Sequence, residues 1–178
     1  GAGLELGGKD PAYVRSDCNF EHAVENLVDG SYFNSGQSCC GIERIYVDES
    51  IFDNFVEAFK TQTEKYILDN PLDKLTNLGP VVKLSAANNI RNQVLKAINE
   101  GAKNIIDGSK FKKDNLKNCY VSPSALINVS HDMEFMMEET FGPTVGIMKV
   151  KNEKDAEVLM NDSAYGLTAS VWTADKEF

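Results

Sequence analysis

The sequence is poor in the residues that bind metals or build disulfide frameworks. It contains only two histidines, His22 and His131, and neither has a partner at the spacing that metal ligands require. Its four cysteines include no CxxC pair, and a chain with this much apolar material does not need a disulfide scaffold to form a core. We therefore expect no metal site and a reducing compartment.

Long apolar runs and an excess of basic charge are also missing. No segment approaches the ~18 apolar residues that span a bilayer, and the N-terminus lacks the basic and apolar regions of a secretory signal. The formal net charge of −9 would repel nucleic acids and anionic membranes. We interpret the one basic cluster, at Lys110, Lys112, Lys113 and Lys117, as a solvated loop. These features predict a cytoplasmic protein that binds neither nucleic acid nor membrane.

Apolar periodicity predicts that strands and helices alternate. We expect short strands at residues 12–14, 45–47, 105–106, 125–129, 144–150 and 167–173. Helices are expected with caps at Asp17 and near Ser50, another between Ser85 and Gly101, and a last one over residues 155–160. With 178 residues the chain can form one domain with a full core. The pattern favours a three-layer α/β fold, in which helices cover a mostly parallel sheet.

Two segments could supply chemistry on a carbonyl group. Residues 4–9 (LELGGK) contain the carboxylate of Glu5, and residues 33–40 (FNSGQSCC) contain the thiol of Cys39. A thiolate attacks an electrophilic carbon far better than a thiol does, and a carboxylate can take the thiol proton or activate a water to cleave a thioester. Spacing alone leaves two alternatives open: Cys39 as a small buried hydrophobe and Glu5 as an incidental charge in an exposed turn.

In this order the two segments resemble the aldehyde dehydrogenase superfamily. The resemblance continues at residues 78–80 (LGP), 120–123 (YVSP), 138–143 (EETFGP) and 161–167 (NDSAYGL), and so covers nearly the whole chain. It implies NAD(P)-dependent oxidation of a small aldehyde to a carboxylic acid through a cysteine thiohemiacetal and thioester. Cys39 would be the nucleophile and Glu5 the general base.

The EETFGP segment resembles the part of the family that binds the nicotinamide half of NAD or NADP. The resemblance implies that Glu139 binds the ribose hydroxyls and that Phe141 packs near the nicotinamide. A ring buried in the core is the alternative for Phe141. Glu138 is expected to be a solvated acid, and the residues at 79–80, 123 and 165–167 are expected to shape turns and strand ends.

The resemblance further implies that residues 1–178 are a fragment of a catalytic domain. In the family, the asparagine that stabilises the oxyanion and most of the cofactor-binding domain lie upstream of the matched region. The C-terminal strand that supports oligomers lies beyond it. We therefore expect the isolated chain to bind NAD(P) poorly and to turn over slowly or not at all, and the full-length protein to form a homo-oligomer.

Two other functions remain possible on the sequence. A CoA-acylating aldehyde dehydrogenase passes its thioester to CoA, but members of that branch generally lack the glutamate that Glu5 matches. A non-catalytic structural or binding protein could keep the fold without the reaction, as enzyme-derived crystallins do. The joint presence of Glu5, Cys39 and Glu139 argues against this second alternative.

Overall fold

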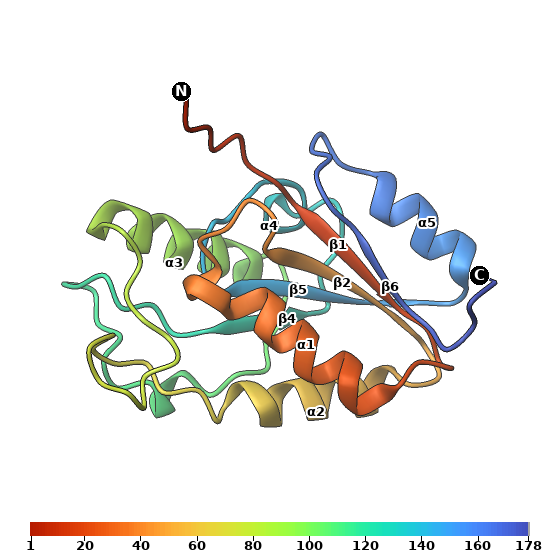
Figure 1. The fold of residues 1–178 in the computed structure, drawn as a ribbon, viewed down its shortest axis with the longest axis horizontal. Helices are drawn as coiled ribbons and strands as arrows, with labels where there is room; N and C mark the ends of the chain where they lie inside the picture. The colour runs from red at the N-terminus through yellow and green to blue at the C-terminus, as the bar shows by residue number, and fades with distance from the viewer. Residues whose placement is uncertain (178) are drawn as a thin grey trace.

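Six strands form a single sheet in the order β3-β4-β5-β2-β1-β6 (Figure 1). The computed structural model describes residues 1–177. Every neighbouring pair is parallel except β3 with β4, which is antiparallel at one edge. The strands are β1 (Asp10–Val14), β2 (Ile42–Asp48), β3 (Lys103–Asn104), β4 (Ser124–Ile127), β5 (Thr144–Val150) and β6 (Ser170–Trp172). The prediction of a mostly parallel sheet is therefore confirmed.

Helices cover both faces of this sheet, because alternate strand residues point to opposite sides. Ala12 and Ile45 belong to the apolar core beneath α1 and α2, whereas their neighbours Tyr13 and Tyr46 belong to a second core beneath α3, α4 and α5 (Figure 1). The helices are α1 (Phe20–Tyr32), α2 (Phe52–Thr63), α3 (Leu84–Asn99), α4 (Glu134–Met137) and α5 (Glu153–Asn161). Two short 3-10 helices, η1 (Phe33–Gly36) and η2 (Gly108–Lys110), complete the elements. The three-layer α/β prediction is confirmed.

The predicted caps of the first two helices are wrong. Asp17 instead accepts hydrogen bonds from the Thr173 hydroxyl at 2.9 Å and the Asp175 amide at 3.2 Å, and the Asn19 side chain caps α1. Ser50 donates its hydroxyl back to Asp48, so α2 begins at Phe52 without a side-chain cap. In both cases a competing partner takes the side chain that would have capped the helix.

Strand ends also differ from the predictions. A strand was expected at residues 105–106, but β3 is Lys103–Asn104. Beyond it the Ile105 amide still donates to the Ala125 carbonyl at 3.0 Å, and the Asn104 side chain accepts the amides of Ile106 and Ala125. β4 ends at Ile127 because Asn128 adopts a left-handed conformation with φ of 58°. The expected strand at 167–173 is shortened to β6. The strand at 144–150 and the helix end before Gly101, whose φ is 113°, agree with the predictions.

The surface features bear on two further expectations. Lys110 and Lys113 of the basic cluster pair with Glu64 and Asp69, so part of its charge is already neutralised within the chain. No helix among residues 1–177 combines the length and apolar character that a membrane crossing requires.

Candidate active site

Five segments that carry the family resemblance lie directly before parallel strands. They are residues 4–9 before β1, 33–40 before β2, 120–123 before β4, 138–143 before β5 and 161–167 before β6. Parallel strands begin at the same edge of a sheet, so these segments gather at one edge although they are distant in sequence. Open α/β sheets usually bind ligands at the opposite, carboxyl edge. The position of the candidate site is therefore set by the loops that enter the strands.

Gly8 is the point where three of these segments meet. A Cβ atom at Gly8 would lie 1.9 Å from the carbonyl oxygen of Cys39, so only glycine allows this approach. The Gly8 amide donates a hydrogen bond of 2.8 Å to Oε1 of Glu139. The structure thus brings the segments of Glu5, Cys39 and Glu139 together through one glycine.

Cys39 lies in a turn that follows an abrupt change of chain direction. Asn34, Ser35 and Gly36 have successive φ values of 51°, 58° and 68°, all in the left-handed region. Such conformations cost about 1–3 kcal/mol for each non-glycine residue and persist only where surrounding contacts hold them. Gly36 is packed so tightly that its Cβ would lie 1.9 Å from the carbonyl oxygen of Gly142. The cysteine turn is therefore fixed between the LELGGK and EETFGP segments.

The segment around Gly79 supports the cysteine turn from another side. The Ser35 hydroxyl donates to the Gly79 carbonyl at 2.8 Å, and the Gln37 side chain accepts the Val82 amide at 2.8 Å. Ser35 is buried, whereas Gln37 is partly exposed. These contacts hold residues 79–82 beside the cysteine turn, where they support its conformation.

Glu5 raises the pKa of the Cys39 thiol. The nearby Glu5 carboxylate, which favours the protonated thiol as a hydrogen-bond acceptor, is the largest cause of the shift, followed by desolvation and by repulsion between Glu5 and a thiolate. The thiol consequently rests protonated, with a carboxylate in place to take its proton. Cys39 is partly exposed and Glu5 is exposed, so neither is a core residue.

Glu139 and Glu138 occupy different environments, as expected from the sequence. Glu139 is partly buried, and desolvation raises the pKa of its carboxyl, although the Gly8 amide opposes the shift. Glu138 is exposed and accepts the Tyr165 hydroxyl at 3.2 Å. Oε2 of Glu139 has no hydrogen-bond donor among residues 1–177 and remains free to accept one.

Phe141 follows in a left-handed conformation with φ of 54°. Its ring is partly exposed and joins none of the three buried apolar clusters of the described residues. The alternative of a core ring is therefore not what the structure shows.

Glu43 is a residue of this region that the sequence analysis missed. It lies in β2, and only 3% of its surface is exposed. Its carboxylate accepts hydrogen bonds from Lys9 Nζ at 2.6 Å and from the amides of Thr140 and Phe141, both at 2.9 Å. The signal in the sequence was the charged pair Glu43-Arg44 at the start of an otherwise apolar strand.

Arg44 connects the site to the end of α5. Its buried guanidinium donates to the carbonyls of Lys9, Leu159, Met160 and Asp162, at distances of 2.8 to 3.3 Å. The carbonyls of Leu159 and Met160 belong to the last turn of α5, and a cation is favourable at a helix C-terminus. The segment that carries Tyr165 is thereby held against β1 and β2.

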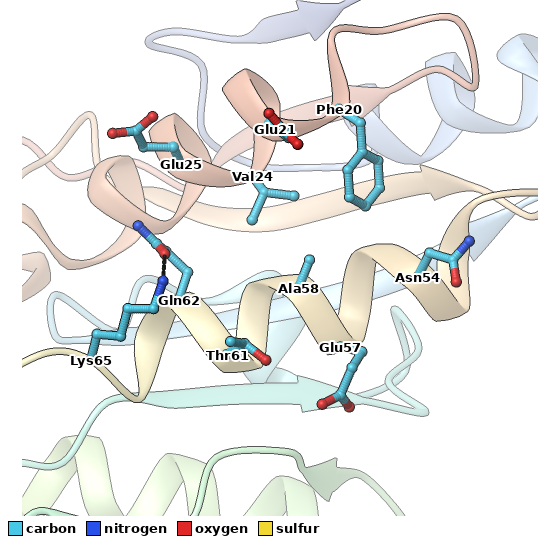
Figure 2. Close-up of a pocket in the computed structure, with 10 residues that line it drawn as sticks. All are labelled: Phe20, Glu21, Val24, Glu25, Asn54, Glu57, Ala58, Thr61, Gln62 and Lys65. Carbon is cyan, nitrogen blue, oxygen red and sulfur yellow. Dashed lines mark hydrogen bonds between the residues drawn. The ribbon is translucent and has the colours of Figure 1, made fainter.

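An open groove between α1 and α2 lies apart from this site. Figure 2 shows Phe20, Val24 and Ala58 between the two helices, in a groove of about 530 Å³. Its rim carries several carboxylates, but none of the predicted site residues lines it. Among the described residues, no three His, Cys, Asp or Glu side chains are grouped so that they could hold a metal ion.

Comparison with known proteins assigns the chain to a family. The model of the aldehyde dehydrogenase family matches residues 2–178. Lactaldehyde dehydrogenase of Methanococcus maripaludis is 37% identical over 172 residues, which are 97% of this chain and 36% of that protein. Cytosolic aldehyde dehydrogenase 1 of Mus musculus is 38% identical over 97% of this chain and 34% of its own length.

Solved structures agree with these relatives. Betaine aldehyde dehydrogenase from Staphylococcus aureus, determined in complex with NAD+, superimposes with a TM-score of 0.90 at 37% identity, over 97% of this chain and 34% of that chain. Glyceraldehyde-3-phosphate dehydrogenase from Methanocaldococcus jannaschii, complexed with NADP, gives a TM-score of 0.89 at 34% identity, over 98% and 36%. The chain spans about a third of the length of these relatives. On sequence and on fold, it belongs to the aldehyde dehydrogenase family.

Proposed function

We propose that residues 1–178 are the catalytic-domain part of an NAD(P)-dependent aldehyde dehydrogenase that oxidises a small aldehyde to a carboxylic acid. The observation that carries this proposal is the convergence at Gly8 of the segments that contain Cys39, Glu5 and Glu139. Nucleophile, base and cofactor-binding carboxylate are the groups that the reaction needs, and here they occupy one edge of the sheet.

In the first half of the reaction, Glu5 removes the proton of the Cys39 thiol. The thiolate sulfur then bonds to the aldehyde carbon, and the carbonyl electron pair moves to oxygen to give a thiohemiacetal oxyanion. NAD or NADP, when bound, would accept the hydride whose loss turns this adduct into a thioester. Backbone amides near Cys39 are candidates to stabilise the oxyanion.

In the second half, Glu5 first releases to solvent the proton that it took from the thiol. It then takes a proton from water, and the resulting hydroxide attacks the thioester carbon. The carbon–sulfur bond breaks, the carboxylic acid leaves, and Glu5 returns its proton to the departing thiolate, which regenerates the Cys39 thiol. The contact between the Glu5 carboxylate and the thiol supports both proton transfers, because the water must approach the carbon bonded to the same sulfur.

Glu139 and Phe141 fit the nicotinamide half of a cofactor. The free Oε2 of Glu139 can accept a hydrogen bond from a ribose hydroxyl, and the partly exposed ring of Phe141 offers an apolar contact. We propose that the adenine half binds a segment outside residues 1–178, because the chain spans only a third of its relatives. The isolated chain is therefore expected to bind NAD(P) weakly and to show little turnover.

The test is NAD(P)H formation by the full-length protein with a panel of aldehydes. Lactaldehyde and betaine aldehyde belong in the panel because relatives of this chain are named for them. Cys39→Ser should abolish turnover, and Cys40→Ser, a neighbouring thiol in the same turn, should retain it. Turnover that survives Cys39→Ser would refute the covalent mechanism.

Two controls address the alternative functions. Formation of the free acid without CoA distinguishes hydrolysis from acyl transfer, and Glu5 beside Cys39 favours hydrolysis. A Cys39 that is inert to iodoacetamide in the full-length protein would support the non-catalytic alternative. Gel filtration of the same protein tests the proposed homo-oligomer.

A further inference from the structure

Glu43 joins the two segments that flank the Gly8–Glu139 hydrogen bond. On one side it accepts Lys9 Nζ at 2.6 Å, and Lys9 directly follows Gly8. On the other side it accepts the amides of Thr140 and Phe141, which directly follow Glu139. The contacts close a ring of hydrogen bonds that begins and ends at the candidate site.

The left-handed conformation of Phe141 explains how one carboxylate reaches two successive amides. Consecutive N–H groups next to a left-handed residue form a concave anion-binding nest. Here the φ of Phe141 is 54°, and the anion that fills the nest is the Glu43 side chain of the chain itself. A non-glycine residue in this region needs such contacts to hold it.

We propose that Glu43 is a positioning residue, which fixes Glu139 and Phe141 relative to Cys39 and thereby sets the affinity of the enzyme for its nicotinamide cofactor. This inference rests on the function proposed above. Glu43 lies four residues after Cys39, on strand β2, so it ties the EETFGP segment to the strand that directly follows the cysteine turn.

Lys9 has a separate part in this arrangement. Removing a carboxylate from water without a partner is costly, and an ion pair with good geometry offsets that cost. The exposed fractions of the Lys9 and Glu43 side chains are 1% and 4%, so solvent cannot replace either partner. Lys9 thus allows a charged acceptor, stronger than a neutral one, to hold the nest.

Glu43→Gln tests these contacts, because it removes the negative charge with little change in side-chain size. The amide oxygen of Gln can still accept one N–H of the nest. Its NH₂ group, however, is a donor and would have to face either the Lys9 ammonium or the Thr140 amide, both of which are donors too. We expect the loop of residues 139–141 to shift. This shift would remove the hydrogen bond between the Glu139 carboxylate and the cofactor ribose. Because a hydrogen bond to a charged group contributes about tenfold or more in affinity, the KM for NAD(P) should rise about tenfold.

The experiment uses the full-length enzyme and compares Glu43→Gln with Glu57→Gln, a matched change on the exposed surface of α2. The expected result is a raised KM and Kd for NAD(P)H, together with faster hydrogen exchange at the Thr140 and Phe141 amides. The rate at which iodoacetamide alkylates Cys39 should stay within about threefold, since the nucleophile itself is not displaced. A purely structural role would lower the folded fraction and leave the Kd of the remaining folded enzyme unchanged.

A second variant covers the case in which Glu43→Gln does not fold. The double change Lys9→Met and Glu43→Leu replaces the ion pair with apolar side chains of similar size, which proteins often tolerate. It removes the acceptor for the nest and should also raise the KM for NAD(P). If the wild-type enzyme binds NAD(P)H and a folded variant has an unchanged KM for NAD(P), the proposed role of Glu43 is overturned but the proposed function is not. Wild-type enzyme that binds neither cofactor overturns the proposed function as well.

Discussion

Replacing Gly8 with alanine should disrupt the candidate site through one steric contact. The added Cβ would lie 1.9 Å from the Cys39 carbonyl oxygen, whereas ordinary contacts begin at 3.4 Å, so the two segments must separate by about 1.5 Å. Gly8 does not have a positive φ, so alanine adds no backbone strain of its own. The effect of this substitution on activity therefore reports only on the close approach of the LELGGK segment to the cysteine turn.

A separation of this size is large compared with catalytic tolerances. Misplacement by 1 Å can cost about 10²-fold in rate, so kcat/KM of the full-length enzyme should fall by about 100-fold or more. Overpacking should also lower the free energy of unfolding by about 1–3 kcal/mol. Steady-state kinetics and urea unfolding measure the two effects separately.

Gly108→Ala is the matched control. A Cβ at Gly108 would meet no atom within 4 Å, so both kcat/KM and stability should stay close to wild type. If folded Gly8→Ala enzyme kept kcat/KM within about twofold of wild type, the close approach would not matter for catalysis and the reasoning about the site would be refuted.

Three further predictions concern charge and burial. Glu5→Gln removes the carboxylate that raises the pKa of Cys39, so the pH midpoint of iodoacetamide alkylation should move down while turnover falls; an unchanged midpoint would contradict the contact between them. Lys9→Met leaves the Glu43 carboxylate buried without its cation and should cost about 3–5 kcal/mol in urea unfolding, more than Lys9→Met combined with Glu43→Leu; equal losses would contradict coupling of the pair. Burial raises the pKa of Tyr46 to about 12, above its value of about 10 in the unfolded chain, so its contribution to stability is complete below pH 10 and is lost as the pH rises toward 12. The free energies of unfolding of wild type and Tyr46→Phe, measured between pH 8 and 12, should therefore converge toward pH 12. A constant difference between them would contradict this prediction.

Much of the architecture could be predicted from local patterns. Short, mostly apolar runs rich in β-branched residues at 45–47 and 144–150 are typical of buried strands, and the apolar face at Ala23, Val24 and Leu27 has the period of a helix. Caps and strand ends were less predictable, because Asp17 and Asn104 bind partners that lie far along the chain. Which side chain such a residue contacts depends on the packed structure and not on its neighbours in sequence.

The sequence by itself determined the family, the alternation of strands and helices, and the candidate groups Cys39, Glu5, Glu139 and Phe141, because each rests on residues within a short segment. The tertiary structure alone decided that these segments meet at the edge where parallel strands begin, and that Gly8 is their point of contact. It alone also revealed the contacts of Glu43, whose partner Thr140 is 97 residues away. Contacts at such separations leave no periodic trace in the sequence, since they arise only when the strands assemble side by side.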